Sequence, residues 1–151
     1  IRVHTNTPPP HMPEIFSVQR RVEFRDTDAA GIVHFTAFFA YMEEAEHALL
    51  RACGTSVVAE QDGHTISWPR VSAHCDFSGA AHFEEVLTIE VCVERLGEKS
   101  ATYGFRFVSR NTEIAVGRIT SVCCQLEPNQ PPQSIAIPSA LADRLKAYQR
   151  S

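Results

Sequence analysis

Hydrophobic positions recur with helical spacing in only one long stretch of the chain. Between residues 36 and 53 they occur at steps of three and four residues: Phe38, Met42, Ala45, Leu49 and Ala52. This spacing predicts a helix with one apolar face. Thr36 can cap the start of the helix, and Gly54 suits the left-handed turn that follows a helix end.

The second half of the chain alternates hydrophobic and polar residues instead. Alternation from Leu87 to Glu94, from Ser100 to Phe107 and from Asn111 to about Leu126 predicts three strands joined by short turns. Two earlier strands are expected at residues 17–24 and 67–77. In the second of these, the residues on one face are Val71, Ala73, Cys75 and Phe77.

These elements predict an α+β domain. About five strands and one long helix do not alternate as strand–helix–strand units, which excludes a Rossmann-type parallel sheet. The apolar helix face must therefore pack on one face of a curved antiparallel sheet. Residues 138–150 can form a short C-terminal helix with Leu141, Leu145 and Tyr148 on one side. We expect residues 1–14 to be a flexible, Pro-rich N-terminal tail and residues 15–151 to form a single domain.

Composition and charge limit the kinds of partner and the cellular environment that we expect for this chain. The net charge of −4 argues against nucleic acid, because phosphate binding favours a basic surface. No apolar run approaches the ~20 residues that a membrane-spanning helix needs. Five cysteines without C-x-x-C spacing or a leader indicate buried thiols in a reducing compartment, the cytoplasm.

Candidate chemistry is concentrated in the segment Phe24–Phe35. A strand runs into Asp26 and Asp28, a glycine follows at position 31, and a helix then begins. A helix start offers unpaired N–H groups and a positive dipole end, which favour nearby carboxylates. The alternative is that both aspartates are solvated turn residues. The apolar run from Gly31 to Phe35 favours aspartates that border a buried region.

This segment resembles the signature of the hydroxybenzoyl-CoA thioesterase family of hot-dog-fold proteins, Asp-x-Asp-x-x-Gly-[Ile/Val]-Val-aromatic. The resemblance continues through residues 69–72, 81–89 and 96–100 and reaches about Leu126. It implies a hot-dog fold, in which one long central helix packs on a curved sheet. It also implies an acyl-CoA thioesterase that hydrolyses an acyl- or aroyl-CoA to the free acid and coenzyme A.

The resemblance also implies catalytic roles. Asp28 would be the catalytic carboxylate, either a nucleophile or a general base on water, and the Phe35 backbone N–H would be the oxyanion donor. Gly31 allows the tight turn between them. Asp26 would be structural, capping the turn or pairing with Arg25 or Arg21.

His34 has two interpretations. The acyl-CoA thioesterases of the Tol–Pal cluster carry an aromatic residue followed by His, whereas here His34 precedes Phe35. His34 therefore either contacts the acyl group and takes part in catalysis, or is a core histidine. The other candidate ligands, His74, Asp76 and His82, lack metal-ligand spacing, so neither a metal site nor a cofactor is expected. Coenzyme A would enter as part of the substrate.

Substrate contacts follow from the same resemblance. Lys99 and Ser100 match a basic turn that meets coenzyme A, although Gly97 and Glu98 stand where hydroxybenzoyl-CoA enzymes are more basic. The other substrate-binding candidates are Gly31, Val33, Trp68, Pro69 and Ser72. The last three would approach the acyl group, often from a partner subunit, although Trp68 could equally be a core aromatic residue.

The open sheet edges and the resemblance together predict a homo-oligomer, a dimer or a homotetramer. Three other functions stay possible at this stage. The first is a hot-dog dehydratase or hydratase, the second is a non-catalytic acyl-binding module, and the third is a thioesterase that uses Glu43 or Glu46 in place of Asp28.

Overall fold

The computed structural model describes residues 15–150, so the tail predicted for residues 1–14 lies outside the described residues. Its main sheet has five antiparallel strands in the order β1-β5-β6-β7-β4. Their bounds are β1 Phe16–Arg21, β4 Arg70–Phe77, β5 Val86–Leu96, β6 Ser100–Ser109 and β7 Thr112–Val122. The α+β class with an antiparallel sheet is therefore confirmed, and the three predicted meander strands are β5, β6 and β7. The third ends at Val122 and not near Leu126, because Cys124–Leu126 forms a separate short strand of the second sheet.

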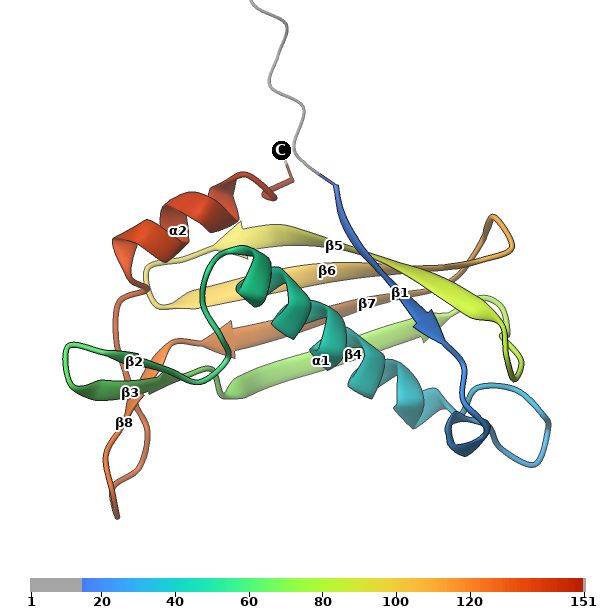
Figure 1. Ribbon diagram of the computed structural model, residues 1–151, viewed down its shortest axis with the longest axis horizontal. Helices are drawn as coiled ribbons and strands as arrows, with labels where there is room; N and C mark the ends of the chain where they lie inside the picture. Colours follow the sequence, from blue (N-terminus) through green and yellow to red (C-terminus); the bar gives the residue numbers. More distant parts are fainter. Residues whose placement is uncertain (1–14, 151) are drawn as a thin grey trace, which may run out of the picture.

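One long helix, α1 (Phe35–Ala52), lies across one face of this sheet (Figure 1). Its buried residues include Phe38, Met42, Ala45 and Leu49, as the helical spacing predicts, and also Tyr41, Glu46 and Leu50. They pack against buried strand residues such as Leu87, Tyr103 and Ile119 to form one core. The helix ends before Gly54, which has the left-handed φ of +81° expected after a helix end.

The start of α1 differs from the prediction. The helix begins at Phe35, and the residue that caps it is His34 rather than Thr36. The His34 ring nitrogen accepts from the Thr36 backbone N–H, so Thr36 lies inside the first turn. Helix propensity did not reveal this because histidine is an uncommon cap, whereas threonine is a common one.

A second, smaller sheet was absent from the sequence-based expectation. It has the order β2-β3-β8-β9 and contains Ala59–Gln61, His64–Ser67, Cys124–Leu126 and Gln133–Ser134. These strands have two to four residues each, too short for an alternation pattern to stand out. The short helix α2 (Ser139–Lys146) packs beside β5 and buries Leu141 and Leu145. It falls within the predicted segment 138–150.

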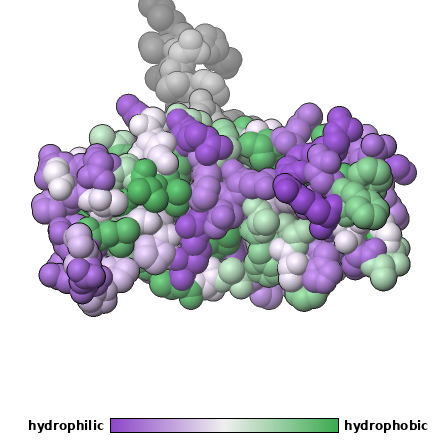
Figure 2. All heavy atoms as spheres, turned by 60° about the horizontal axis from the view of Figure 1, so that its bottom comes forward, coloured by the Kyte–Doolittle hydropathy of each residue, from purple (hydrophilic) through white to green (hydrophobic). Residues whose placement is uncertain are grey.

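Strand β4 forms one free edge of the main sheet. The residues predicted to share one face of β4 are less buried than a core face would be, since Val71 is 63% and Phe77 46% exposed. Figure 2 brings the lower edge of Figure 1 forward, and on that face hydrophobic residues gather in several groups among hydrophilic ones. The exposed apolar positions of β4 therefore leave this edge without cover in a single chain.

Within the described residues, neither helix has the length and hydropathy needed to cross a membrane.

Candidate active site

The loop between β1 and α1 (residues 22–34, here called the acidic loop) is fixed at both ends by backbone hydrogen bonds. Val22 is fully buried, and its N–H donates to the Glu85 carbonyl at 2.8 Å. Near the other end, the Val33 N–H donates to the Ala81 carbonyl at 2.9 Å. The loop is thus tied to the segment that precedes β5, at the end of the sheet away from α2 (Figure 1).

Within the acidic loop the chain reverses tightly around Asp28. The Asp28 N–H donates to the Ile32 carbonyl, and the Gly31 N–H donates back to the Asp28 carbonyl, both at 2.9 Å. Gly31 has a φ of +77°, and a Cβ at this position would meet nothing within 4 Å. The turn therefore needs glycine for its backbone conformation and not for space.

The Asp28 side chain is only partly engaged. Its Oδ1 accepts from the Ala30 N–H at 2.8 Å, which orients the carboxylate, and the residue is exposed. Among residues 15–150, no donor contacts the other carboxylate oxygen. Asp28 therefore presents one oriented and one available oxygen, as a nucleophile or a general base requires.

The Asp26 side chain is, by contrast, largely enclosed, with 12% of its surface exposed. Its Oδ2 accepts from the Tyr41 hydroxyl at 2.8 Å and from the Glu23 N–H at 2.9 Å. Arg20 approaches to 3.6 Å and Arg25 to 4.0 Å. Burial, followed by the Asp26 hydrogen bond, raises the pKa of Tyr41 well above its ordinary value. Asp26 thus has the contacts of a structural residue, with Arg20 in the place where Arg21 was expected.

His34 and Phe35 form the start of α1. The His34 Nδ1 accepts from the Thr36 N–H at 3.2 Å and lies 2.7 Å from the Thr36 hydroxyl, while its ring stacks on Phe35 with centroids 4.6 Å apart. Since Nδ1 is an acceptor, the proton of neutral His34 lies on Nε2. His34 is half-buried at the helix start and is not part of the core cluster.

The Phe35 N–H is the first amide of α1, and within the described part of the chain it has no acceptor. It points out of the positive end of the helix dipole, where a developing oxyanion is favoured. The acidic loop therefore brings together Asp28, Gly31, Val33, His34 and Phe35. Sequence reasoning placed these five residues in one site.

The remaining predicted residues lie at the opposite end of the sheet in the same chain. Trp68 is buried, with 2% of its surface exposed, and its carbonyl accepts from Arg70 at 2.9 Å. The Pro69 carbonyl accepts from the Val122 N–H, and Ser100 pairs with Val122. The Lys99 carbonyl accepts from the Cys123 N–H. These residues cluster near the start of β4, whereas the end of β4 lies beside the first turn of α1, where Phe77 packs against Phe38.

Ser72 lies exposed near the start of β4, opposite Thr120 of β7. Seven residue steps of β4 separate Arg70 from Phe77, roughly 23 Å at the usual rise of a strand. A single chain therefore does not assemble all the predicted substrate-binding residues in one place.

A buried polar cluster of Glu46 and Arg70 lies on the sheet side of α1, and sequence reasoning gave it little weight. Glu46 is fully buried, and its carboxylate contacts the Arg70 guanidinium at 3.0 Å. Burial raises the pKa of Glu46 to about 7, and the Arg70 charge opposes that rise. A signal was present in the sequence, because Glu46 stands four residues after Met42 and three before Leu49, on the apolar face.

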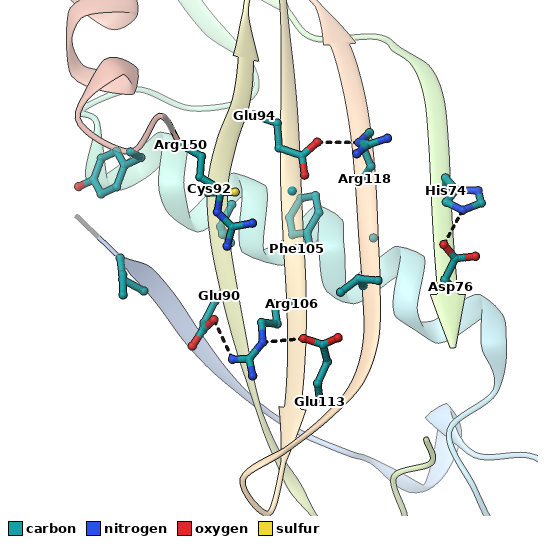
Figure 3. Close-up of a pocket in the computed structure, with 16 residues that line it drawn as sticks. His74, Asp76, Glu90, Cys92, Glu94, Phe105, Arg106, Glu113, Arg118 and Arg150 are labelled. Atoms are coloured by element: carbon teal, nitrogen blue, oxygen red, sulfur yellow. Dashed lines mark hydrogen bonds and ion pairs between the residues drawn. The ribbon is translucent and has the colours of Figure 1, made fainter. Parts of the chain in front are cut away.

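The other face of the main sheet carries a groove of about 500 Å³ (Figure 3). Each of its carboxylates pairs with a neighbouring basic side chain. Arg106 bridges Glu90 at 3.1 Å and Glu113 at 2.7 Å. Arg118 contacts Glu94 at 2.6 Å, and His74 contacts Asp76 at 3.0 Å. No residue of the acidic loop lines this groove, so it is separate from the candidate active site.

Comparison with known proteins decides the family. The sequence matches the family model of the thioesterase-like superfamily over residues 22–145. The chain belongs to this superfamily. The resemblance to hot-dog-fold thioesterases is confirmed, and with it the prediction that the chain is a thioester hydrolase.

Individual relatives of this thioesterase-like chain are named for aroyl-CoA substrates. It is 32% identical over 93 residues to the 4-hydroxybenzoyl-CoA thioesterase of Pseudomonas sp. (strain CBS-3), covering 59% of this chain and 64% of that protein. It is 26% identical over 132 residues to the 1,4-dihydroxy-2-naphthoyl-CoA hydrolase of Synechococcus elongatus, and the match covers 87% of this chain and 95% of that protein. The structure of a gentisyl-coenzyme A thioesterase is similar, with a TM-score of 0.73 and 27% sequence identity. The match covers 87% of this chain and 99% of that chain.

Proposed function

We propose that this thioesterase hydrolyses an acyl- or aroyl-CoA to the free acid and coenzyme A, with Asp28 as the catalytic carboxylate. The observation that carries the proposal is that the acidic loop and the start of α1 present two groups without a partner in the described residues. These groups are the free oxygen of Asp28 and the Phe35 N–H. The first can attack or activate water, and the second can stabilise the negative oxygen that forms. The proposed reaction needs no cofactor, since coenzyme A belongs to the substrate.

Two chemically balanced routes of thioester hydrolysis are open to this site. In the first, the Asp28 carboxylate attacks the thioester carbonyl carbon, coenzyme A leaves as the thiolate, and water hydrolyses the resulting mixed anhydride. In the second, Asp28 takes a proton from water, the hydroxide adds to the carbonyl, and the thiolate leaves with a proton. Both pass through a tetrahedral oxyanion beside the Phe35 N–H. His34 Nε2, which carries a proton in the neutral ring, is placed to donate a hydrogen bond at the same helix start.

We further propose that two copies of the chain complete the site. Antiparallel pairing of β4 with β4 of a second copy would continue the sheet and cover its exposed apolar positions. Because the two strands would run in opposite directions, the start of one β4 would lie beside the end of the other. Trp68, Pro69, Ser72, Lys99 and Ser100 of one copy would then approach the acidic loop of its partner. The dimer is thus the proposed unit, and a homotetramer would be a pair of such dimers.

The names of the relatives favour an aromatic acyl group. They act on hydroxybenzoyl, dihydroxynaphthoyl and gentisyl thioesters by name. The exposed Phe35 ring, stacked on His34, offers an aromatic surface at the mouth of the site, and Phe35 is 59% exposed. Stacked aromatic groups attract one another beyond their buried area.

A panel of acyl-CoA thioesters tests the proposal, with free thiol measured colorimetrically. The panel should span aroyl, short aliphatic and long aliphatic groups. We expect thiol release with at least one aroyl thioester and loss of that release in Asp28→Asn. Binding of the thioesters without thiol release would instead indicate an acyl-binding module and contradict the proposed hydrolysis.

A further inference from the structure

The acidic loop is attached to a short turn that precedes β5, residues 82–85, here called the anchor turn. At the first end of the loop, the Val22 N–H donates to the Glu85 carbonyl at 2.8 Å, and the Glu84 N–H donates back to the Val22 carbonyl at 2.9 Å. This reciprocal pair of backbone hydrogen bonds fixes the start of the acidic loop on the anchor turn.

The second half of the acidic loop is attached to the same segment. Ile32 pairs with His82 as an isolated antiparallel bridge, and the next residue, Val33, donates its N–H to the Ala81 carbonyl at 2.9 Å. The Asp28 N–H in turn donates to the Ile32 carbonyl at 2.9 Å. The position of Asp28 therefore follows the position of the anchor turn through backbone hydrogen bonds.

The anchor turn has a strained backbone. The Glu85 N–H donates to the His82 carbonyl at 3.1 Å and closes the turn. Glu84 stands inside it with a φ of +70°, in the left-handed region that glycine adopts easily and that costs free energy for a residue with a Cβ. A backbone held in this region persists only where surrounding contacts stabilise it.

The Glu85 carboxylate supplies such contacts on both of its oxygens. One oxygen contacts the His82 Nδ1 across the turn at 3.1 Å and Arg110 at 3.3 Å, and the other accepts from the Ser109 hydroxyl at 2.8 Å. Burial alone would raise the pKa of Glu85, but the hydrogen bonds from Ser109 and His82 lower it, so the group is ionised at neutral pH. Ser109 ends β6, and Arg110 follows it in the turn that leads to β7. The carboxylate thus joins the anchor turn to the tip of the β6–β7 hairpin.

The start of α1 is held by a different part of the molecule. Phe38, in the first turn of the helix, is 3% exposed, and its ring packs edge-on against Phe107 of β6 with centroids 5.1 Å apart. The Phe35 N–H is therefore placed by the packing of α1 on the sheet, whereas Asp28 is placed by the anchor turn. A shift of the anchor turn changes the distance between these two groups.

We propose that Glu85 is a positioning residue for thioester hydrolysis, because its carboxylate holds the strained anchor turn and the anchor turn sets the distance between Asp28 and the Phe35 N–H. This role rests on the proposed function, since it concerns the same site. Glu85 acts through the backbone and does not touch the substrate. A misplacement of about 1 Å at a reacting group can lower the rate by about a hundredfold, so a slight loosening of the turn is enough to lower kcat.

Kinetics on an active aroyl-CoA test the positioning role, with Glu85→Gln as the variant and Glu84→Gln as the matched control. The Glu84 side chain is exposed and has no hydrogen bond or ion pair among residues 15–150. Glu85→Gln keeps the shape but loses the charge, and its amide group presents a donor where the carboxylate accepts. We expect kcat to fall about tenfold with KM within about twofold of wild type, as for a misplaced catalytic group. Glu84→Gln should follow wild type.

A second substitution tests the link to backbone strain. Glycine adopts the φ of position 84 without strain, so Glu84→Gly should stabilise the anchor turn when Glu85 no longer does. Added to Glu85→Gln, it should recover about twofold to fivefold of the lost kcat, the usual effect of relieving such a conformation. A residue with a general role in stability would not be rescued in kcat by a change of backbone preference next to it.

Hydrogen exchange measures the loosening without substrate. In Glu85→Gln the amides of Asp28, Gly31 and Val33 should exchange about tenfold faster than in wild type, as expected when a charged hydrogen-bond partner is removed. The amide of Ala45, in the buried part of α1, should exchange at the wild-type rate. Faster exchange at Ala45 as well would indicate a general loss of stability and contradict the positioning role.

Three kinetic results would overturn the proposal: an unchanged kcat in Glu85→Gln, an equal loss in Glu84→Gln, and a loss that lies in KM alone. If Glu85→Gln does not fold, Ser109→Ala replaces it, because it removes one hydrogen bond to the carboxylate, and it should lower kcat about threefold. An unchanged kcat in that variant would reject the proposal. A wild type that releases no thiol would reject the proposed function and the positioning role with it, whereas an active wild type with an equally active Glu85→Gln would reject the positioning role alone.

Discussion

Asp26 and Asp28 have the same chemistry and stand two residues apart, but their carboxylates have different surroundings. Asp28 keeps one oxygen without a donor in the described residues, whereas Asp26 is enclosed by Tyr41, Glu23 and Arg20. We expect Asp28→Asn to lower kcat by about a hundredfold or more with little change in KM, because the lost interaction belongs to the transition state. Enzyme kinetics on an active thioester would measure this.

Asp26→Asn is the matched control. It should leave kcat within a few fold of wild type but lower the thermal midpoint, because the neutral amide loses the charge that Tyr41 and Arg20 contact. If Asp28→Asn keeps a near-normal kcat while Asp26→Asn or Glu43→Gln abolishes activity, the assignment of the catalytic carboxylate is wrong.

His34 combines a helix cap with a position at the proposed site, and two substitutions separate these roles. Asn can cap a helix as His34 does, whereas Ala cannot. We expect both His34→Asn and His34→Ala to lower kcat about tenfold or more, within the range of acid–base groups. Only His34→Ala should also lose about 1 kcal/mol of folding free energy. Full activity in His34→Asn would reduce the role of this residue to capping.

Glu46 should also give the fold a pH dependence. Its pKa is raised from 4.5 in the unfolded chain to about 7 in the folded one, chiefly by burial. The folded protein therefore keeps a proton that the unfolded chain has lost. The stability contributed by this group is complete below pH 4.5 and is lost as pH rises through about 7.

Chemical denaturation of wild type and Glu46→Gln at one protein concentration would measure this effect. From pH 5 to pH 8 wild type should lose stability relative to Glu46→Gln, which has no proton to lose at this position. Glu43→Gln should follow wild type, since Glu43 is 57% exposed. Parallel pH curves for wild type and Glu46→Gln would contradict the raised pKa.

The packing of α1 on the sheet depends on Gly117 of β7. A Cβ at this position would lie 2.3 Å from the Met42 sulfur and 3.2 Å from the His74 carbonyl. The absent side chain lets the helix approach the sheet closely, so Gly117→Ala should overpack this contact and cost about 1–3 kcal/mol. The free energy of unfolding would report the effect.

Val116→Ala is the natural control for that substitution. Val116 is the preceding residue, points to the other face of the sheet and is 41% exposed. Its truncation should change the stability by less than about 0.5 kcal/mol. Equal stability of Gly117→Ala and wild type would show that α1 can shift without cost.

The edge strand β4 connects the single chain to its proposed assembly. Light scattering at micromolar concentration should give at least the mass of a dimer. Val71→Lys should shift the protein toward monomer, because a lysine on an edge strand opposes pairing with another strand. Val71 is 63% exposed, so the fold itself should survive.

Val58→Lys provides a control on another exposed valine, which is 55% exposed and lies outside β4. It should leave the mass unchanged. A monomeric wild type would contradict both the predicted homo-oligomer and the proposal that two copies share the site.

Local patterns in the sequence determined the elements that are long and regular. The helical spacing from Phe38 to Ala52 and the alternation in β5, β6 and β7 are repeated over many residues, so they identify these elements without tertiary information. The acidic loop was also readable, because its candidate residues are close in sequence and a glycine marks its turn. The second sheet was missed, since strands of two to four residues carry no periodicity, and Cys124–Leu126 was assigned to the end of the third long strand.

Tertiary structure decided what depends on distance between segments far apart in the chain. It placed Trp68, Lys99 and Ser100 at the end of the sheet opposite Asp28, and it joined Glu46 of α1 to Arg70 of β4. It also distinguished the two aspartates, because Tyr41 reaches one of them from the second turn of the helix. Sequence spacing fixes which residues share a face of one element. How the whole chain packs decides which faces then meet and which carboxylate is shielded from solvent.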